Sequence, residues 1–136
     1  MNGARFSWIS GVDRRRPGPD GTPLPLYWVR QAIRRDPDNA GAYRLAAEIA
    51  RDMKHPSAGG FWAQAVKRNP ADGRLRLDYA AWLVENRQYQ AAHEQLNQAE
   101  EINRRLQAFS SASIYLFGER EKKTISTLRA RIGNRQ

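Results

Sequence analysis

Residues 73–100 read GRLRLDYAAWLVENRQYQAAHEQLNQAE, and this stretch decides the fold that the sequence predicts. In its first half, apolar residues recur at intervals of three and four, which is the spacing of an α-helix with buried sides. The same spacing resumes at Tyr89 and continues to Leu106, with no proline to interrupt it. The stretch therefore predicts two helices, at about 74–86 and from Gln88 for about 19 residues, paired antiparallel across a short turn.

The rest of the chain predicts four more helices and no strand, so the fold class is all-α. These helices lie at about 26–35, 40–52, 57–68 and 113–131. In the first, one apolar stripe comprises Trp28, Val29, Ala32 and Ile33. In the last, the residues expected to point inward are Phe117, Ile125, Leu128 and Ile132. Residues 1–25 contain four prolines and four glycines, and they predict an irregular basic arm.

The residues that break the chain between these helices form a repeated pattern. The tetrapeptides 36–39 (DPDN) and 69–72 (NPAD) stand 33 residues apart, and predicted helical hairpins lie on each side. A pitch of about 33–34 residues with two helices per unit resembles the tetratricopeptide repeat family. In the unit 73–100, the residues that match the family pattern are Tyr79, Ala80, Leu83, Tyr89, Ala92, Leu96 and Ala99. The closing proline of the pattern is absent, and Arg104 stands near its place.

The resemblance covers roughly residues 26–106, because the unit 40–70 matches more loosely and 24–37 resembles half a unit. It implies a short tetratricopeptide-like solenoid of stacked antiparallel helix pairs, with helices 40–52 and 74–86 side by side. Residues 107–136 would then form a capping helix with a basic tail, and residues 1–25 the arm. An unrelated helical bundle with an accidental proline period is the alternative.

The family binds an extended or helical peptide on the concave face that the first helix of each pair lines. Carried over position by position, this implies partner-binding residues Arg44, Glu48, Arg51, Arg74, Leu77, Ala81, Val84 and Glu85. Leu77, Ala81 and Val84 form an apolar strip flanked by charge, which suits an amphipathic helix. Alternatively, the chain's own arm or terminal helix covers this strip. The expected function is a non-catalytic scaffold or adaptor in a larger assembly, with pairing to a second copy as an option.

Residues that carry catalysis or bind metal are scarce. The chain has no cysteine, which excludes disulfides, thiolate metal sites and a cysteine nucleophile. Its two histidines, His55 and His93, lack the spaced partners of a zinc site. Residues 118–124 place a Lys-Thr pair after a glycine but lack the second glycine of a phosphate-binding loop. We therefore expect neither an enzyme nor a cofactor.

The charge suggests a second function. The net charge is +9, and residues 1–36 and 107–136 carry most of the excess. Such ends can attract nucleic acid or another polyanion, although they serve solubility as well. The candidate residues are Arg14, Arg15, Arg16, Arg120, Lys122, Lys123, Arg129 and Arg131. No apolar run is long enough to span a membrane and no signal peptide is evident, which favours a soluble cytoplasmic protein unless the chain is a fragment of a larger envelope protein.

Overall fold

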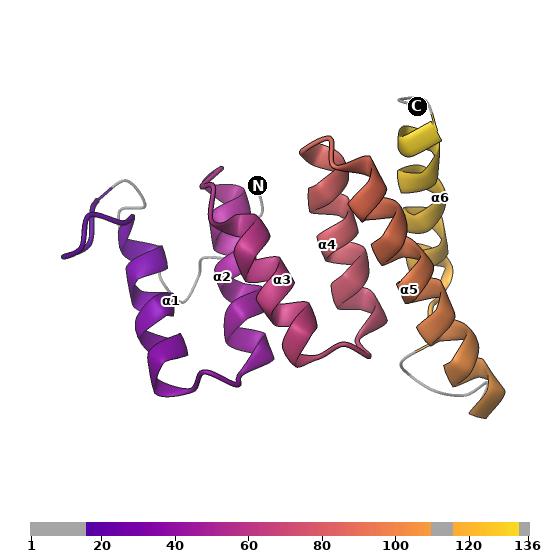
Figure 1. Ribbon diagram of the computed structural model, residues 1–136, viewed down its shortest axis with the longest axis horizontal. Helices are drawn as coiled ribbons and strands as arrows, with labels where there is room; N and C mark the ends of the chain where they lie inside the picture. Colours follow the sequence, from indigo (N-terminus) through magenta and orange to yellow (C-terminus); the bar gives the residue numbers. More distant parts are fainter. Residues whose placement is uncertain (1–15, 110–115, 134–136) are drawn as a thin grey trace. The chain divides into compact units, whose positions relative to one another are not determined.

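A computed structural model describes residues 16–109 and 116–133 of the 136-residue chain. This part is all-helical, as predicted: it holds six α-helices, and its β-structure is limited to one isolated bridge between Pro17 and Pro23. The helices are α1 (Leu24–Arg35), α2 (Ala40–Asp52), α3 (Ala58–Arg68), α4 (Gly73–Glu85), α5 (Tyr89–Phe109) and α6 (Glu119–Gly133) (Figure 1). None of these six is both long enough and apolar enough to cross a membrane.

The chain divides into two compact units between Arg68 and Asn69. In the first unit, α2 packs against both α1 and α3. The fully buried large side chains of this unit include Leu26, Ile49 and Trp62, one from each helix. Alanines make up much of the buried surface of α2 and α3, and such small side chains let packed helices approach closely. They are Ala46, Ala47, Ala50, Ala58 and Ala65.

The predicted apolar stripe of α1 is wrong in part. Val29 is buried, but Trp28 and Ala32 are exposed, and the other buried residues of this helix are Pro25 and Leu26. In its unit, α1 packs chiefly on one neighbour, α2. A single neighbour covers a narrow stripe, so the residues at its edge stay in water.

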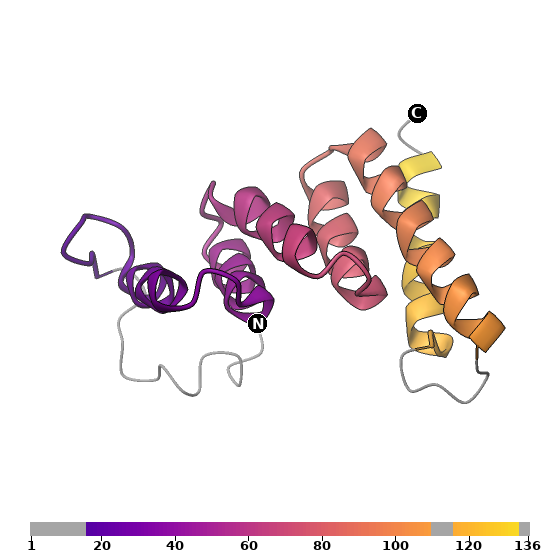
Figure 2. The same cartoon turned by 60° about the horizontal axis from the view of Figure 1, so that its bottom comes forward.

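The second unit is built around α4, which packs against both α5 and α6 (Figures 1 and 2). The figures show α5 returning antiparallel to α4, with α6 alongside. One core joins the three helices, and its buried members are Leu77, Ala80, Leu83, Val84, Ala92, Leu96, Ala99, Phe117, Ile125, Leu128 and Ile132. The prediction that a C-terminal helix caps the second hairpin is thus confirmed.

The last helix begins later than predicted. Residues 113–115 of the predicted helix lie outside the described residues, and residues 116–118 are not helical. The helix starts at Glu119 because a capping interaction precedes it. The Glu121 side chain accepts a hydrogen bond of 2.7 Å from the backbone N–H of Gly118. This is half of a capping box, which fixes the first turn at that position.

The two 13-residue helices α2 and α4 begin with the same cap. The side chain of Asn39 accepts a hydrogen bond from the N–H of Ala42 at 3.1 Å. Thirty-three residues later, the side chain of Asp72 accepts one from the N–H of Leu75, also at 3.1 Å. The two capping residues share an extended backbone conformation, with φ near −80° and −87°. Both caps satisfy an amide that a helix start leaves without a partner.

The same two helices also end alike. Lys54 and Arg87, again 33 residues apart, both adopt a left-handed backbone, with φ of 54° and 60°. At the first end, the N–H of Lys54 bonds to the carbonyl of Arg51 and the N–H of His55 to that of Ala50. The end of α4 repeats this pattern one for one, since Arg87 bonds to Val84 and Gln88 to Leu83. This is the Schellman motif, and it reverses the chain into the second helix of each hairpin.

The 33-residue repeat therefore exists in three dimensions at the level of individual hydrogen bonds. It applies to each hairpin by itself. That the two hairpins stack side by side stays a prediction.

Replacing Lys54 or Arg87 with glycine should raise the free energy of unfolding. A left-handed backbone costs a residue with a Cβ atom about 1 kcal/mol, and glycine escapes this cost. We expect Lys54→Gly and Arg87→Gly each to stabilise the chain by up to about 1 kcal/mol in urea unfolding. The control is Gln98→Gly at an exposed position inside α5, which should destabilise by about 1 kcal/mol. A loss of stability in all three variants would contradict the left-handed backbone at Lys54 and Arg87.

Candidate functional site

The apolar strip that the sequence assigned to a partner lies against the chain's own last helix. Leu77 and Val84 are 4% and 2% exposed and belong to the core that α6 completes, whereas Ala81 is partly buried at its edge. The alternative that the sequence left open, burial under the terminal helix, is therefore what the structure shows. A partner could reach Leu77 and Val84 only by opening the core that α4, α5 and α6 share.

The other residues of the predicted concave face remain accessible. Arg44, Glu48 and Arg51 are partly exposed on α2, and Glu85 is exposed at the end of α4. The repeat relates the two helices residue by residue: 33 positions separate Arg44 from Leu77, Glu48 from Ala81, and Arg51 from Val84. At these equivalent positions α2 therefore carries charged side chains, whereas α4 carries apolar ones. It is α4 that packs against α6.

Arg74, another predicted contact residue, fastens the segment before α6. Its guanidinium donates a hydrogen bond of 2.8 Å to the carbonyl of Leu116 and lies 3.6 Å from the Glu121 carboxylate. The hydrogen bond from the Gly118 amide and the nearby Arg74 charge lower the pKa of Glu121 below its ordinary value. These contacts hold α6 to the start of α4, so Arg74 serves the fold of this unit.

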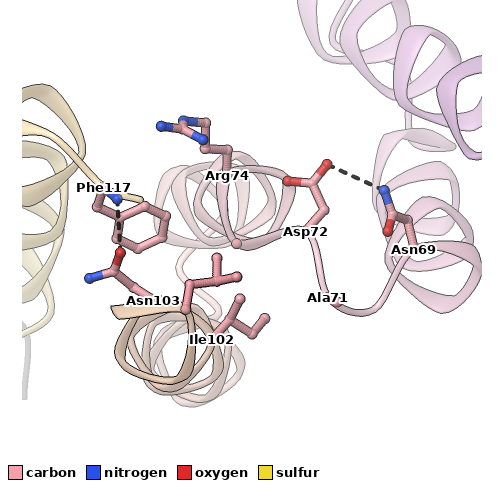
Figure 3. Close-up of a pocket in the computed structure, with 9 residues that line it drawn as sticks. Asn69, Ala71, Asp72, Arg74, Ile102, Asn103 and Phe117 are labelled. Atoms are coloured by element: carbon pink, nitrogen blue, oxygen red, sulfur yellow. Dashed lines mark hydrogen bonds between the residues drawn. The ribbon is translucent and has the colours of Figure 1, made fainter. Parts of the chain in front are cut away.

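A pocket of about 280 Å³ lies beside these contacts, where α5 extends past the start of α4 (Figure 3). Its apolar wall includes Ile102, Leu106 and Phe117. Its polar groups already have partners within the unit: the side chain of Asn103 accepts from the N–H of Phe117 at 2.8 Å, and Asp72 caps α4. Figure 3 shows the Phe117 ring directed at the start of α4.

Gly73 explains why this ring fits. A Cβ atom built on Gly73 would lie 2.8 Å from Cζ of Phe117, closer than real contacts allow. The equivalent position of the first hairpin, 33 residues earlier, is Ala40. Glycine therefore stands at this position of the repeat where an aromatic ring approaches the helix start. The sequence alone gave no signal for this contact, because Gly73 and Phe117 are 44 positions apart.

The predicted polyanion-binding residues differ in exposure and in their contacts. Arg14 and Arg15 lie outside the described residues, whereas Arg16 is exposed. On α6, Arg129 is held by side chains of α5, and it bonds to Glu100, Asn97 and His93. The remaining basic residues of α6 are exposed, and they are Arg120, Lys122, Lys123 and Arg131.

The two histidines are near the surface. His55 is partly buried in the turn after α2 and contacts the hydroxyl of Ser57 at 2.7 Å through Nδ1. His93 is exposed on α5, beside Arg129. Within residues 16–109 and 116–133, no group of three or more His, Cys, Asp or Glu side chains is placed to hold a metal ion.

Sequence reasoning missed one surface feature. Trp28 is 52% exposed on α1, and its ring packs edge-on against Tyr27 at 5.3 Å between ring centroids. The periodicity placed Trp28 inward because a tryptophan is a large apolar residue. Burial of α1 on one side leaves it outward instead.

Comparisons with known proteins add no identification. No family model matches the chain, and neither a curated protein nor a solved structure matches it.

Gly73→Ala should destabilise the second unit by about 1–3 kcal/mol, the usual cost of overpacking a core. The added methyl forces the Phe117 ring away, although alanine by itself favours a helix over glycine. The matched experiment repeats Gly73→Ala in a Phe117→Leu background, where most of the penalty should disappear. Urea unfolding of the four chains measures both values. An equal penalty in the two backgrounds would show that the ring contact is not its cause.

Glu121→Gln should lower the free energy of unfolding at neutral pH by about 1 kcal/mol, since a charged acceptor bonds more strongly than a neutral one. The folded pKa of Glu121 is lowered from 4.5, so its contribution is complete above that value and is lost as pH falls through the folded pKa. The difference between wild type and variant should therefore be constant above about pH 6 and shrink in acid.

Glu119→Gln, which alters an exposed acid of the same helical turn, is the control for this measurement. Its effect should be clearly smaller. A difference between wild type and Glu121→Gln that grows in acid would have the wrong sign for a lowered pKa.

Proposed function

We propose that this chain is a non-catalytic interaction module of tetratricopeptide-like hairpins, and that it binds a partner protein within a larger assembly. Support comes from the hairpins themselves, because two hairpins with equivalent helix starts and ends at a 33-residue pitch are units from which a repeat scaffold can be built. Repeat scaffolds present extended surfaces built from successive helices, and such surfaces serve binding. The observation that carries the proposal is the half-exposed Trp28 on α1.

The contact surface is the outward stripe of α1, which comprises Leu24, Trp28, Gln31 and Arg35 at intervals of four, three and four. These intervals place the four side chains on one side of a helix. Among the large hydrophobic residues that the structure describes, Trp28 and Phe109 are the exposed ones. Trp28 differs from Phe109 in lying mid-helix, with the neighbouring Tyr27 ring to hold it.

The charge of α1 defines the partner. Residues 24–35 contain Arg30, Arg34 and Arg35 and no acidic residue. Arg30 lies over the Phe61 ring at 5.7 Å, whereas Arg34 and Arg35 are exposed. Tryptophan and arginine are the residues that most often dominate the affinity of protein interfaces. The stripe therefore fits a protein segment with an apolar side chain for Trp28 and an acidic group for Arg35, with Arg34 exposed nearby on the same helix.

A partner that covers the stripe would remove the half-exposed ring of Trp28 from water, which is a favourable contribution to binding.

The test uses the full chain with a photo-crosslinking residue at Gln31, and the same residue at the exposed Gln98 of α5 as control. We expect a protein crosslinked from position 31 and absent from position 98. That protein, purified, should bind the chain with an affinity that falls at least tenfold in Trp28→Ala. Phe109→Ala, which removes the other exposed aromatic, should leave the affinity unchanged.

Circular dichroism must show that both variants keep the helical content of the parent chain. Equal losses of affinity in Trp28→Ala and Phe109→Ala would exclude the α1 stripe as the contact surface. A purified partner whose binding is insensitive to both changes would do the same.

A further inference from the structure

A second surface, on α6, consists of basic and hydroxyl side chains and has no exposed aromatic residue of the kind that the α1 stripe carries. The inward side of α6 is apolar, with Ile125, Leu128 and Ile132 buried in the core of the second unit. The outward side carries Arg120, Lys123, Thr127 and Arg131, all exposed, at intervals of three, four and four. These intervals align the four side chains along one edge of the helix. We call them the α6 stripe.

The three cations of the α6 stripe take part in no ion pair with the residues that the structure describes, whereas nearby acids are engaged elsewhere. Glu121 lies against Arg74, and Glu100 bonds to Arg129. Glu119, one turn before Lys123, is an acidic neighbour of the stripe. The three cations of the stripe and Glu119 together have a net charge of +2. A shallow hollow along the stripe is lined by Arg120, Lys123, Thr124, Thr127 and Leu128.

The spacing of the stripe suits a phosphate backbone. Arg131 follows Arg120 by eleven positions, which is about 16 Å along a helix. One strand of a duplex presents roughly five phosphates over this length. Arginine, lysine and threonine side chains are the usual phosphate donors of nucleic-acid-binding proteins. The stripe holds no aromatic residue to stack on a base, so it would contact the backbone and not read the sequence.

Two other anionic partners fit less well. A helix that binds a membrane surface inserts an apolar face into the lipid. The apolar face of α6 is buried in its own unit, and the exposed stripe carries no apolar residue to insert. An acidic protein partner would normally find an aromatic or apolar anchor at the centre of its contact, as Trp28 supplies on α1. The stripe offers charge and hydroxyl groups without such an anchor.

We propose that the α6 stripe binds the phosphate backbone of nucleic acid without sequence preference. This site is separate from the proposed protein-binding stripe of α1. The proposal that α6 binds nucleic acid does not depend on whether α1 binds a protein. Of the basic residues that the sequence suggested on α6, the site takes Arg120, Lys123 and Arg131. Arg129 is engaged with α5, and the exposed Lys122 does not share the spacing of the stripe.

Fluorescence anisotropy of the full chain tests the proposal. The labelled probes are duplex DNA, duplex RNA and single-stranded RNA, each about 25 nucleotides per strand, and the salt concentration is varied between about 50 and 200 mM. The stripe variant combines Arg120→Gln, Lys123→Gln and Arg131→Gln. The control variant removes the same charge from exposed positions of α3 and α5, through Lys67→Gln, Arg104→Gln and Arg105→Gln. Both should keep the parent's helical content, because no buried residue is changed.

We expect the stripe variant to lose at least tenfold in affinity for duplex DNA at 50 mM salt, and the control to lose less than threefold. The slope of log affinity against log salt should become shallower by about 2.7, from three lost phosphate contacts at about 0.9 each. Comparison of the three probes then shows which nucleic acid binds most tightly.

Equal losses in the stripe and control variants would overturn the proposal, since they would mean that net charge alone attracts the probe. So would binding to vesicles containing phosphatidylserine with no binding to any of the three probes. A result of either kind leaves the α1 experiment unaffected, because the two surfaces share no residue.

Discussion

Every helix leaves backbone amides at its start and carbonyls at its end without partners, and the hairpins of this chain depend on how those groups are satisfied. At the start of α2 and α4, an Asn or Asp side chain accepts the same amide. At their ends, a residue with a left-handed backbone closes the same pair of hydrogen bonds. These ends set a helix length of 13 residues and the direction in which the second helix leaves. Core packing follows from that geometry.

In the second unit, helix α6 serves two purposes. The inward residues of α6 complete a core that α4 and α5 cannot close alone, and the contact between Arg74 and Glu121 attaches the first turn of α6. Because the apolar side of α6 is used in this way, its exposed side is free to be charged. The consequence for function is a division of surfaces: the apolar strip of α4 belongs to the fold, and the candidate contact surfaces lie on the outer sides of α1 and α6.

Much of the fold could be predicted from the sequence. Helix periodicity is local information, and it placed α2 at residues 40–52, the bounds that the structure has, and the starts and ends of α3 and α4 to within about one residue. The repeated turn residues placed the breaks between the helices, because Asn, Asp and Pro act on their immediate neighbours. The start of α6 was placed too early, since Leu116 and Phe117 continue an apolar pattern although the chain there is not helical.

The sequence by itself determined the all-helical class, the hairpin pairing and the 33-residue pitch, because each depends on interactions between residues close along the chain. Which side of each helix meets another helix was decided by the tertiary structure. Leu77 and Val84 are covered because α6 folds back onto α4, and Trp28 is exposed because α2 covers one side of α1. Gly73 is required because Phe117 approaches it from 44 positions away. Periodicity shows that a helix has an apolar side, but the neighbour that buries it is fixed only when distant segments meet.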